Sequence, residues 1–391
     1  MASTPPARTP TAIQAALDRV PPPWPTWINV ENTLRCNLEC IWCAQHLVGS
    51  TRSGVDMALP LFERIVNEVL PRASRVSFSV AGEPTIAPHF LEFLERVNTL
   101  DVTTELVTNA TALHRPGLLE RLLPRLGLLI ASVDGARPET VERIRAGARH
   151  VRILENLQRF QQARRARPAG SRPEFVLAMT LSTANIDELP EVVDLAWRLG
   201  ADRVACCWLE VHDPSLLGLS LHAAPGRVEE RLTAARTTAR RRGIGLELPG
   251  EPPVCRVEGP GAATRRVLSS LGDRARRRSA LRAALSRAAI RAWEVRTGLG
   301  ARCSFLWGRA YLHAGGAVSP CCVQGRPYVG NLNEQSFEAI WTGPAMTALR
   351  LGMFDGAPHS ACTRCSQGQG PMPAPRESWT APVRNPSDGQ W

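Results

Sequence analysis

The chain has 391 residues, of which 44% are apolar, enough for one large domain or two with a buried core. Its formal net charge is +11, and because the sequence contains no lysine, the whole excess comes from arginine. No apolar run approaches the length of a membrane span. The Pro-, Ala- and Thr-rich start of the chain lacks the apolar middle of a secretory signal. We therefore expect a cytoplasmic protein with no membrane partner.

The basic charge is concentrated in runs of arginine. Residues 164–172, 236–242 and 265–287 carry much of it, and these runs contain few aromatic residues. A nucleic-acid surface combines basic patches with recognisable motifs, so solvated helix faces explain the charge better. Recognition of an acidic substrate is a third use for it. We therefore do not expect a nucleic-acid partner.

Cysteine usage points to metal or redox chemistry, because eleven cysteines occur in a chain without a secretory signal. Cys36, Cys40 and Cys43 follow the spacing C-x3-C-x2-C. Thiolates are soft ligands that select zinc, cuprous copper or iron–sulfur clusters. A structural zinc site usually has four protein ligands, so zinc here requires His46 or a distant group. The alternative is an iron–sulfur cluster with one iron left free for a small molecule.

Apolar periodicity predicts strands and helices that alternate along the chain. In chain order we expect a strand at 26–30, a helix at 59–70, a strand at 75–80, a helix at 89–100, a strand at 102–108, a helix at 117–126, a strand at 127–133, a helix at 138–165 with a break near Gly147, a strand at 174–181, a helix at 186–199, a strand at 203–209 and a helix at 227–242.

Six strand–helix repeats predict an α/β fold with a parallel sheet and outer helices, either an open partial barrel or a doubly wound sheet. In both, functional groups gather at the carboxyl ends of the strands. The cysteine loop follows the first expected strand, Gly82-Glu83-Pro84 the second, Asn109 the third and Asp134 the fourth. We therefore expect these groups to meet at one rim.

These motifs together resemble the radical S-adenosylmethionine (SAM) superfamily. Ala81-Gly82-Glu83-Pro84 matches the family's Gly-Gly-Glu-Pro segment, with alanine in place of the first glycine. The resemblance implies a partial (β/α)6 TIM-like barrel over about residues 26–250. It also implies a [4Fe–4S] cluster on Cys36, Cys40 and Cys43, whose free iron chelates SAM.

The resemblance assigns SAM contacts to particular residues. Gly82 permits close backbone approach, and Glu83 accepts from the SAM amine; a carboxylate before a helix N-terminus is the alternative for Glu83. Ser132 and Asp134 would bind the ribose diol, although Asp134-Gly135 is also a typical turn sequence. Two weaker assignments follow: Arg145 lies near the SAM carboxylate, and Trp42 lies beside adenine, unless it is core.

The same resemblance implies the chemistry. An electron from a flavodoxin- or ferredoxin-type donor enters the cluster and breaks a carbon–sulfur bond of SAM. A 5'-deoxyadenosyl radical then abstracts hydrogen from the substrate. The cofactor carries this chemistry, while the protein positions the substrate and excludes water and oxygen.

A second group of cysteines lies near the C-terminus: Cys303, Cys321, Cys322, Cys362 and Cys365. Residues 315–320 predict a hairpin turn that leads into a strand, which would place Cys303 and Cys321 on adjacent strands. Four thiolates form either a structural zinc site or a fully ligated [4Fe–4S] cluster.

This second group resembles the SPASM and twitch extensions of radical SAM enzymes. Both open with C-x(9–15)-G-x4-C, which Cys303, Gly316 and Cys321 fit. A full SPASM domain needs three further cysteines after the C-x2-C pair, and none follows Cys365. The resemblance therefore implies a shorter, twitch-like β-hairpin and helix domain with one auxiliary [4Fe–4S] cluster. Its ligands would be Cys303, Cys321, Cys362 and Cys365, with Cys322 able to replace its neighbour.

Two further thiols, Cys207 and Cys255, are candidate hydrogen-atom donors, although an inert thiol is the simpler interpretation of each. For the domains, we expect a disordered segment at 1–25, the radical SAM core at 26–250 and a basic helical bridge at 251–300. The auxiliary-cluster domain would follow at 301–366, with a disordered tail at 367–391.

Three functions remain open. The first is a radical SAM oxidoreductase or epimerase that acts on a small polar metabolite, such as an amino sugar, cyclitol or nucleoside, in the manner of antibiotic-biosynthesis enzymes. The second is a maturase that modifies a ribosomally made peptide. Only about 35 residues precede Cys36, fewer than the N-terminal peptide-recognition domain such enzymes commonly carry, but maturases without this domain exist. The third is a zinc-binding module without enzymatic activity.

Overall fold

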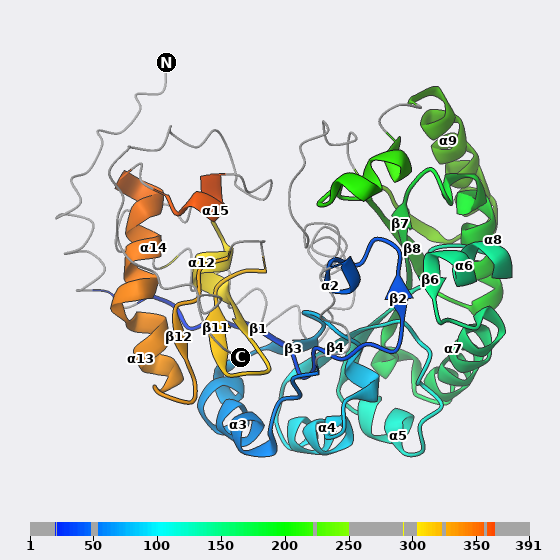
Figure 1. Cartoon of the computed structure of the whole chain (residues 1–391). Coiled ribbons are helices and arrows are strands. Elements are labelled where there is room, and N and C mark those ends of the chain that lie inside the picture. Colours follow the sequence, from blue (N-terminus) through cyan, green and yellow to red (C-terminus); the bar gives the residue numbers. More distant parts are fainter. Residues whose placement is uncertain are drawn as a thin grey trace.

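The computed structural model of the chain describes residues 20, 22–47, 54–221, 225–249, 292, 303–322, 326–355 and 358–363. Within these residues, ten strands form one curved sheet in the order β12-β11-β10-β1-β3-β4-β5-β7-β8-β9. Figure 1 shows the sheet as an open arc with helices along its outer side. The predicted tail at 367–391 lies outside the described residues, as do nearly all of the predicted segments at 1–25 and 251–300.

The core of the sheet consists of parallel strands that are neighbours in chain order. They are β1 (Trp27–Val30), β3 (Arg75–Phe78), β4 (Thr103–Thr108), β5 (Leu126–Ser132), β7 (Glu174–Leu181) and β8 (Arg203–Trp208). A doubly wound sheet would reverse its strand order partway across. The partial barrel is therefore confirmed, and the doubly wound alternative is wrong.

Helices connect these strands and cover the convex face of the sheet (Figure 1). They are α3 (Leu59–Arg64), α4 (Phe90–Asn98), α5 (Leu118–Leu122), α7 (His150–Arg165), α8 (Leu189–Leu199) and α9 (Pro225–Arg242). The helix α3 continues through a π-helical turn, Ile65–Val69, so the predicted 59–70 helix is irregular. The helix α8 ends at Gly200, whose φ of +70° suits the left-handed cap that glycine favours.

One feature of the core was not expected, and one predicted irregularity is present. A seventh parallel strand, β9 (Gly245–Glu247), pairs with β8 and lengthens the sheet. The predicted 138–165 helix is divided into α6 (Pro138–Ile144) and α7, with a short strand, β6 (Arg145–Ala146), between them. Gly147 follows β6 with a φ of +91°, which accounts for the break in the helical pattern.

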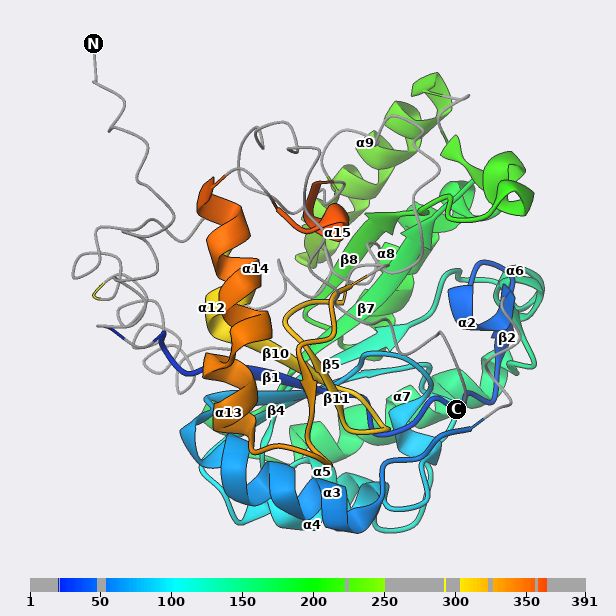
Figure 2. The same cartoon turned by 60° about the vertical axis from the view of Figure 1, so that its left-hand side comes forward.

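The C-terminal region joins the same sheet. It contains α12 (Phe305–Gly308), β10 (Arg309–Leu312), β11 (Ala317–Ser319) and β12 (Gly330–Asn331), followed by α13 (Phe337–Thr342), α14 (Pro344–Asp355) and α15 (Ser360–Thr363). The strand β10 lies parallel to β1, and β11 and β12 continue antiparallel beyond it. Figure 2 shows β10 and β11 beside β1, with α13 and α14 at the same edge. The expected hairpin is therefore an extension of the barrel sheet.

The two faces of the sheet bury different side chains. On the convex face, Leu177, Met179 and Cys206 belong to the large core cluster shared with the helices. On the concave face, Val176, Ala178 and Cys207 belong to a second, smaller cluster. Because side chains alternate along a strand, neighbouring residues of β7 and β8 point to opposite faces. The concave wall of β5, β7 and β8 is therefore apolar.

The concave face beside β1 is polar. The indole Nε1 of Trp27 donates to Ser77 Oγ (2.9 Å), and Ser77 Oγ donates to Glu105 Oε2 (2.7 Å). A guanidinium nitrogen of Arg75 lies 3.0 Å from Glu105 Oε1 and completes a buried ion pair. Arg203, lower on β8, similarly pairs with Glu174 and Glu247. These pairs lie toward the amino-terminal ends of the strands, opposite the cysteine loop.

Candidate active site

The three-cysteine loop begins directly after β1 and is fixed by main-chain pairing. Its residues Glu39–Cys40 form a short strand, β2, which pairs antiparallel with β6 so that Cys40 lies opposite Arg145. The thiols of Cys36, Cys40 and Cys43 are all partly buried. Burial raises the pKa of the Cys40 thiol to about 12, although the nearby charge of Arg145 lowers it.

The turn at Gly82 packs directly on this loop. Gly82 has a φ of +66°, and a Cβ placed on it would lie 2.5 Å from the carbonyl oxygen of Thr33 and 2.6 Å from that of Arg35. The amide of Glu83 donates to the Arg35 carbonyl (2.7 Å), and the amide of Gly82 donates to Gln45 Oε1 (2.7 Å). Only glycine fits this contact, and the loop and the turn form one unit.

The carboxylate of Glu83 is buried and holds the turn to the end of β4. Its Oε1 accepts from the Thr85 amide (3.1 Å), the Thr85 hydroxyl and the Thr108 hydroxyl (2.7 Å), and its Oε2 accepts from the Asn109 amide (2.6 Å). Burial raises the pKa of Glu83, although these hydrogen bonds lower it. Because each oxygen of an ionised carboxylate can accept more than one hydrogen bond, and Oε2 accepts one from the described residues, Oε2 retains capacity for a ligand.

Asp134 and Arg145 form a second buried pair at the same rim. Arg145 Nη1 lies 3.3 Å from Asp134 Oδ2, and Asp134 Oδ1 accepts from the Thr180 amide (2.7 Å). Asp134 adopts a φ of +61°, which is uncommon for residues other than glycine. The charge of Arg145 also interacts with Cys36 and Cys40. Asp134 is therefore already engaged by the protein.

Asn109 is a rim residue that links the β4 end to the cysteine loop. Its side-chain Nδ2 donates to Asn37 Oδ1 (3.0 Å) and lies 4.0 Å from Cys36 Sγ. Its Oδ1 accepts from the amide of Thr111 (2.9 Å). The sequence places Asn109 at the rim but gives no signal for Asn37, Thr111 or Gln45, since these contacts join separate loops.

The remaining predicted SAM contacts lie on the same elements. Ser132 ends β5 and is partly buried, and Trp42 lies in the cysteine loop, also partly buried. Cys207 points to the concave face, where Thr180 Oγ1 lies 3.6 Å from its Sγ, whereas Cys206 belongs to the helix-covered core. Cys255 lies outside the described residues.

The prediction that Cys303 and Cys321 lie on adjacent strands is wrong. Cys303 precedes α12 and is not on a strand, Cys321 and Cys322 follow β11, and Cys362 lies in α15. Cys365 lies outside the described residues. The side chain of Cys322 forms a hydrogen bond with the buried Tyr311 of β10, so this thiol faces the concave side of the sheet. The alternation of β10 and β11 gave no indication of this contact.

The cysteine loop and its neighbours contain groups suited to an iron–sulfur cluster and to an anionic ligand of that cluster. Within the described ranges, no group of three or more Cys, His, Asp or Glu side chains is arranged to hold a single metal ion. Arg145 adds a buried Nε with no hydrogen-bond partner, which is a donor available to an anion. The donor set therefore fits an iron–sulfur cluster with an anionic ligand.

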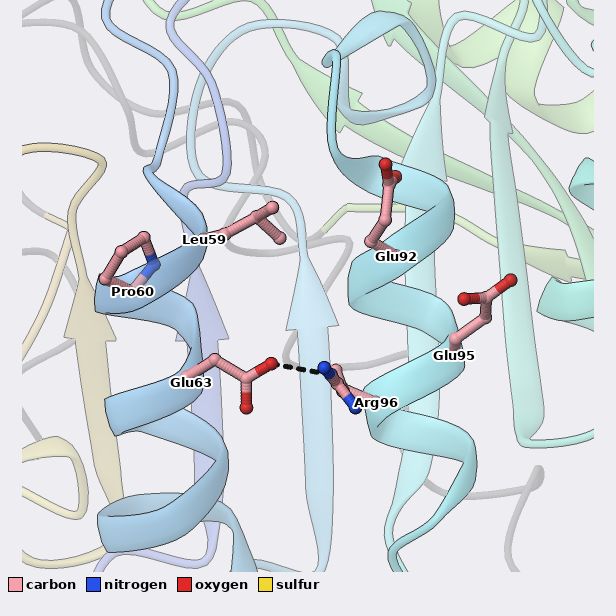
Figure 3. Close-up of a pocket in the computed structure, with 6 residues that line it drawn as sticks. All are labelled: Leu59, Pro60, Glu63, Glu92, Glu95 and Arg96. Atoms are coloured by element: carbon pink, nitrogen blue, oxygen red, sulfur yellow. Dashed lines mark ion pairs between the residues drawn. The ribbon is translucent and has the colours of Figure 1, made fainter.

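One surface pocket of the described residues lies away from this rim. It measures about 390 Å³ and lies between α3 and α4, lined by Leu59, Pro60, Glu63, Glu92, Glu95 and Arg96. Figure 3 shows the ion pair between Glu63 and Arg96 across it. No residue of the cysteine loop lines this pocket, which lies on the helical layer and not at the rim.

Parallel strands closed into a partial barrel, with a thiol loop after the first strand, define a class of iron–sulfur enzymes. The sequence matches the model of the radical SAM superfamily over residues 30–196 and that of SPASM, an iron–sulfur cluster-binding domain, over residues 303–366. The chain belongs to the radical SAM superfamily and carries a C-terminal SPASM domain. These domains imply a SAM-binding [4Fe–4S] cluster, an auxiliary cluster and SAM.

Several curated proteins are similar to this chain. A PqqA peptide cyclase of Methylobacterium sp. (strain 4-46) is 29% identical over 186 residues, 46% of either chain. The tungsten-containing aldehyde ferredoxin oxidoreductase cofactor-modifying protein of Pyrococcus furiosus is 27% identical over 183 residues, 45% of this chain and 49% of that protein. An AdoMet-dependent heme synthase of Methanosarcina barkeri is 28% identical over 180 residues, which are 45% of this chain and 48% of that protein. The matches thus span about half the length of these relatives.

Solved structures share the fold. Streptococcus suis SuiB bound to S-adenosylmethionine superposes with a TM-score of 0.59 at 15% identity, covering 90% of this chain and 73% of that one. The enzyme anSMEcpe with bound AdoMet superposes with a TM-score of 0.55 at 16% identity, covering 88% and 86%. Among the described residues of this chain, no helix has both the length and the apolar character needed to cross a membrane.

Proposed function

We propose that this radical SAM enzyme modifies a peptide substrate. The observation that carries the proposal is the recurrence of PqqA peptide cyclases, at 26–29% identity, among the curated relatives. The sequence alone favoured oxidation or epimerisation of a small polar metabolite, and the relatives change that preference. A SuiB structure with its precursor peptide bound has the same fold as this chain, at 15% identity.

The first cluster would be held by Cys36, Cys40 and Cys43. When bound, the cluster and SAM supply a 5'-deoxyadenosyl radical that removes a hydrogen atom from the substrate. In this proposal Gly82 lets the turn pack closely on the loop that holds the cluster, since a Cβ there would collide with the loop carbonyls. The spare acceptor capacity of Glu83 Oε2 suits the SAM amine, and the unpartnered Nε of Arg145 suits its carboxylate.

The remaining contacts would surround the nucleoside. Ser132 and Asp134 lie at the carboxyl end of β5 and offer hydroxyl and carboxylate oxygens to the ribose, and Trp42 would lie beside adenine. Asp134 is already bonded to Arg145 and Thr180, so its proposed contact uses its remaining lone pairs. In the SPASM domain, Cys303, Cys321, Cys362 and Cys365 would hold the auxiliary cluster.

Epimerisation of a residue in the peptide is a second candidate reaction, and the orientation of Cys207 favours it. An epimerase returns a hydrogen atom to the opposite face of the carbon radical, and a thiol can supply it. Cys207 lies on the apolar concave wall beside Thr180, whereas Cys206 is buried against the helices. Cys255 remains a prediction for the same role.

Deuterium transfer tests the peptide proposal. The anaerobically reconstituted chain would be incubated with SAM, a flavodoxin or dithionite as reductant, and deuterated short peptides encoded beside its gene. We expect deuterium in 5'-deoxyadenosine and a mass change in one peptide, both absent from Cys40→Ala. Parallel samples would contain deuterated amino sugars, cyclitols or nucleosides without peptide. Deuterium transfer from one of these, and from none of the peptides, would overturn the proposal.

A further inference from the structure

Arg350 is a buried cation in the C-terminal domain. It lies in α14 with only 1% of its surface exposed. Its guanidinium carbon lies 5.1 Å from the ring centroid of Trp307 and 4.7 Å from that of Trp341. Contacts with indole faces stabilise a cation through the negative face of the ring. They do not replace the solvation that a fully buried charge loses.

The hydrogen bonds of Arg350 leave its charge uncompensated. Its Nε donates to the carbonyl of Leu306 (3.2 Å) and its Nη1 to that of Trp341 (2.8 Å), while Nη2 is buried without a hydrogen-bond partner. No carboxylate of the described residues forms an ion pair with it. Burial lowers the pKa of Arg350 to about 9, so it remains a cation at neutral pH.

The guanidinium is linked through Leu306 to the backbone of Cys303, the first predicted ligand of the auxiliary cluster. Its acceptor Leu306 lies in α12, and the amide of Leu306 donates to the carbonyl of Cys303 (3.2 Å). Cys303 and Cys362 both pack against the core that contains Trp307 and Trp341. Two hydrogen bonds through Leu306 therefore connect the cation to the backbone of Cys303, which would bind the cluster as a thiolate.

An iron–sulfur cluster with four thiolate ligands is an anion, and one-electron reduction adds a further negative charge. The reduction potential of such a cluster depends on its net charge and on the charges and hydrogen bonds around it. A buried cation nearby favours the more negative, reduced state. Attraction to the bound anion also offsets the free energy that the cation loses when it is buried away from water.

We propose that Arg350 is the internal counter-charge of the auxiliary cluster, a positioning residue that favours binding of the cluster and raises its reduction potential. The proposal rests on the auxiliary cluster that the SPASM domain implies and not on the identity of the substrate. It can therefore fail while the peptide proposal stands, or the reverse.

A redox titration tests the effect of the charge. The reconstituted full-length chain would carry Cys36→Ala, Cys40→Ala and Cys43→Ala, so that only the auxiliary cluster contributes to the paramagnetic resonance signal. Arg350→Gln removes the charge but keeps a donor, and Arg350→Lys keeps the charge. Arg164→Gln is the matched control, because Arg164 is a buried arginine on the outer helix α7, paired with Asp202.

We expect Arg350→Gln to raise the ratio of oxidised to reduced cluster at least tenfold, measured at the midpoint potential of the parent. This change corresponds to a decrease of about 59 mV in the midpoint potential of the cluster. Arg350→Lys should change the ratio less than threefold, and Arg164→Gln should not change it. A ratio within twofold of the parent for Arg350→Gln would overturn the proposal. So would equal shifts for Arg350→Gln and Arg350→Lys.

Thermal melting separates the charge from the hydrogen bonds if cluster loading falls. Arg350→Met would be melted with the cluster and after its removal by a chelator. A counter-charge predicts that the decrease in melting temperature is at least twice as large with the cluster as without it. Equal decreases would show that only the packing and the two carbonyl hydrogen bonds matter, and the proposal would be wrong.

Discussion

The imidazole Nδ1 of His313 lies 3.3 Å from the carboxylate Oε1 of Glu31. Glu31 directly follows β1 and His313 directly follows β10, so this buried contact joins the start of the cysteine loop to the SPASM domain. His313 Nε2 lies 2.9 Å from Ser319 Oγ, which donates to the carbonyl of Cys321 (2.8 Å). One chain of hydrogen bonds therefore connects the two predicted cluster regions.

Loss of the Glu31 carboxylate should weaken this junction. We expect Glu31→Ala to lower the free energy of unfolding by about 3 kcal/mol, because a buried pair loses one partner and leaves the other unpaired. Urea denaturation of the cluster-free chain measures it. Glu120→Ala, at an exposed position of α5, should change it by less than about 0.5 kcal/mol. Equal effects of the two substitutions would contradict the role of the junction.

The stability of the chain should also depend on pH through Glu31. Burial would raise the pKa of Glu31, but His313, Arg326 and the Ala314 amide together hold it below its usual range. The unfolded chain then binds this proton more readily, so the stabilisation is complete above the unfolded pKa of about 4.3 and is lost as pH falls through the folded value. Unfolding measured from pH 6 to 3 should show a smaller loss of stability in Glu31→Gln than in the parent.

Gly82 should tolerate no side chain. An alanine there would need a left-handed conformation, which costs about 1–2 kcal/mol, and its Cβ would collide with two carbonyl oxygens of the cysteine loop. We expect Gly82→Ala to lower both the melting temperature and the iron bound by the first cluster. Gly170→Ala is the control, because a Cβ at Gly170 would meet nothing within 4 Å. Normal iron content in Gly82→Ala would show that the loop adapts.

Substitutions around Glu83 should separate ligand binding from stability. Glu83→Gln removes the charge offered to SAM, whereas Thr108→Val removes one hydroxyl that donates to Glu83. We expect Glu83→Gln to weaken SAM binding to the reconstituted protein at least tenfold by equilibrium dialysis. Thr108→Val should cost about 1 kcal/mol of stability and change SAM affinity less than threefold. If Glu83→Gln lowered stability but left SAM affinity unchanged, the role of Glu83 would be purely structural.

Cys207 and Cys206 provide a matched pair for the epimerase candidate. If Cys207 donates hydrogen, product made in deuterated water carries solvent deuterium, and Cys207→Ala abolishes that label while still cleaving SAM. Cys206→Ala should retain the label, because its thiol packs against the outer helices. Unlabelled product from the parent enzyme would exclude epimerisation and leave oxidation of the peptide.

Local sequence signals accounted for much of the barrel and its rim. The helix breaks at Gly147 and Gly200 coincide with left-handed glycines, and the strand ends at Gly82, Asn109 and Asp134 meet beside the cysteine loop. These features follow from nearby residues, since turn chemistry and hydrophobic period act over a few positions. The rule that parallel strands present their carboxyl ends at one edge then brings them together.

Other features depend on contacts between distant segments. The pairing of β10 with β1 joins residues about 280 positions apart, and nothing in the local pattern of either strand specifies its partner. The pair of Glu83 with Thr108 and the bond between Tyr311 and Cys322 likewise cross separate loops. Alternation along the strand shows that Cys206 and Cys207 point to opposite faces of the sheet. Only the packing of the helices identifies Cys207 as the one on the concave face.

The sequence by itself determined the ligand chemistry, because three thiols on one short loop need no distant segment to be recognised. It also determined the parallel barrel, through the repeated strand and helix periods. The tertiary structure alone decided where charges become buried. Nothing in the residues around Arg350 predicts that it is buried, and it becomes an uncompensated cation only when α14 packs against Trp307 and Trp341. Burial is a property of the assembled layers, so it cannot be read from the order of residues.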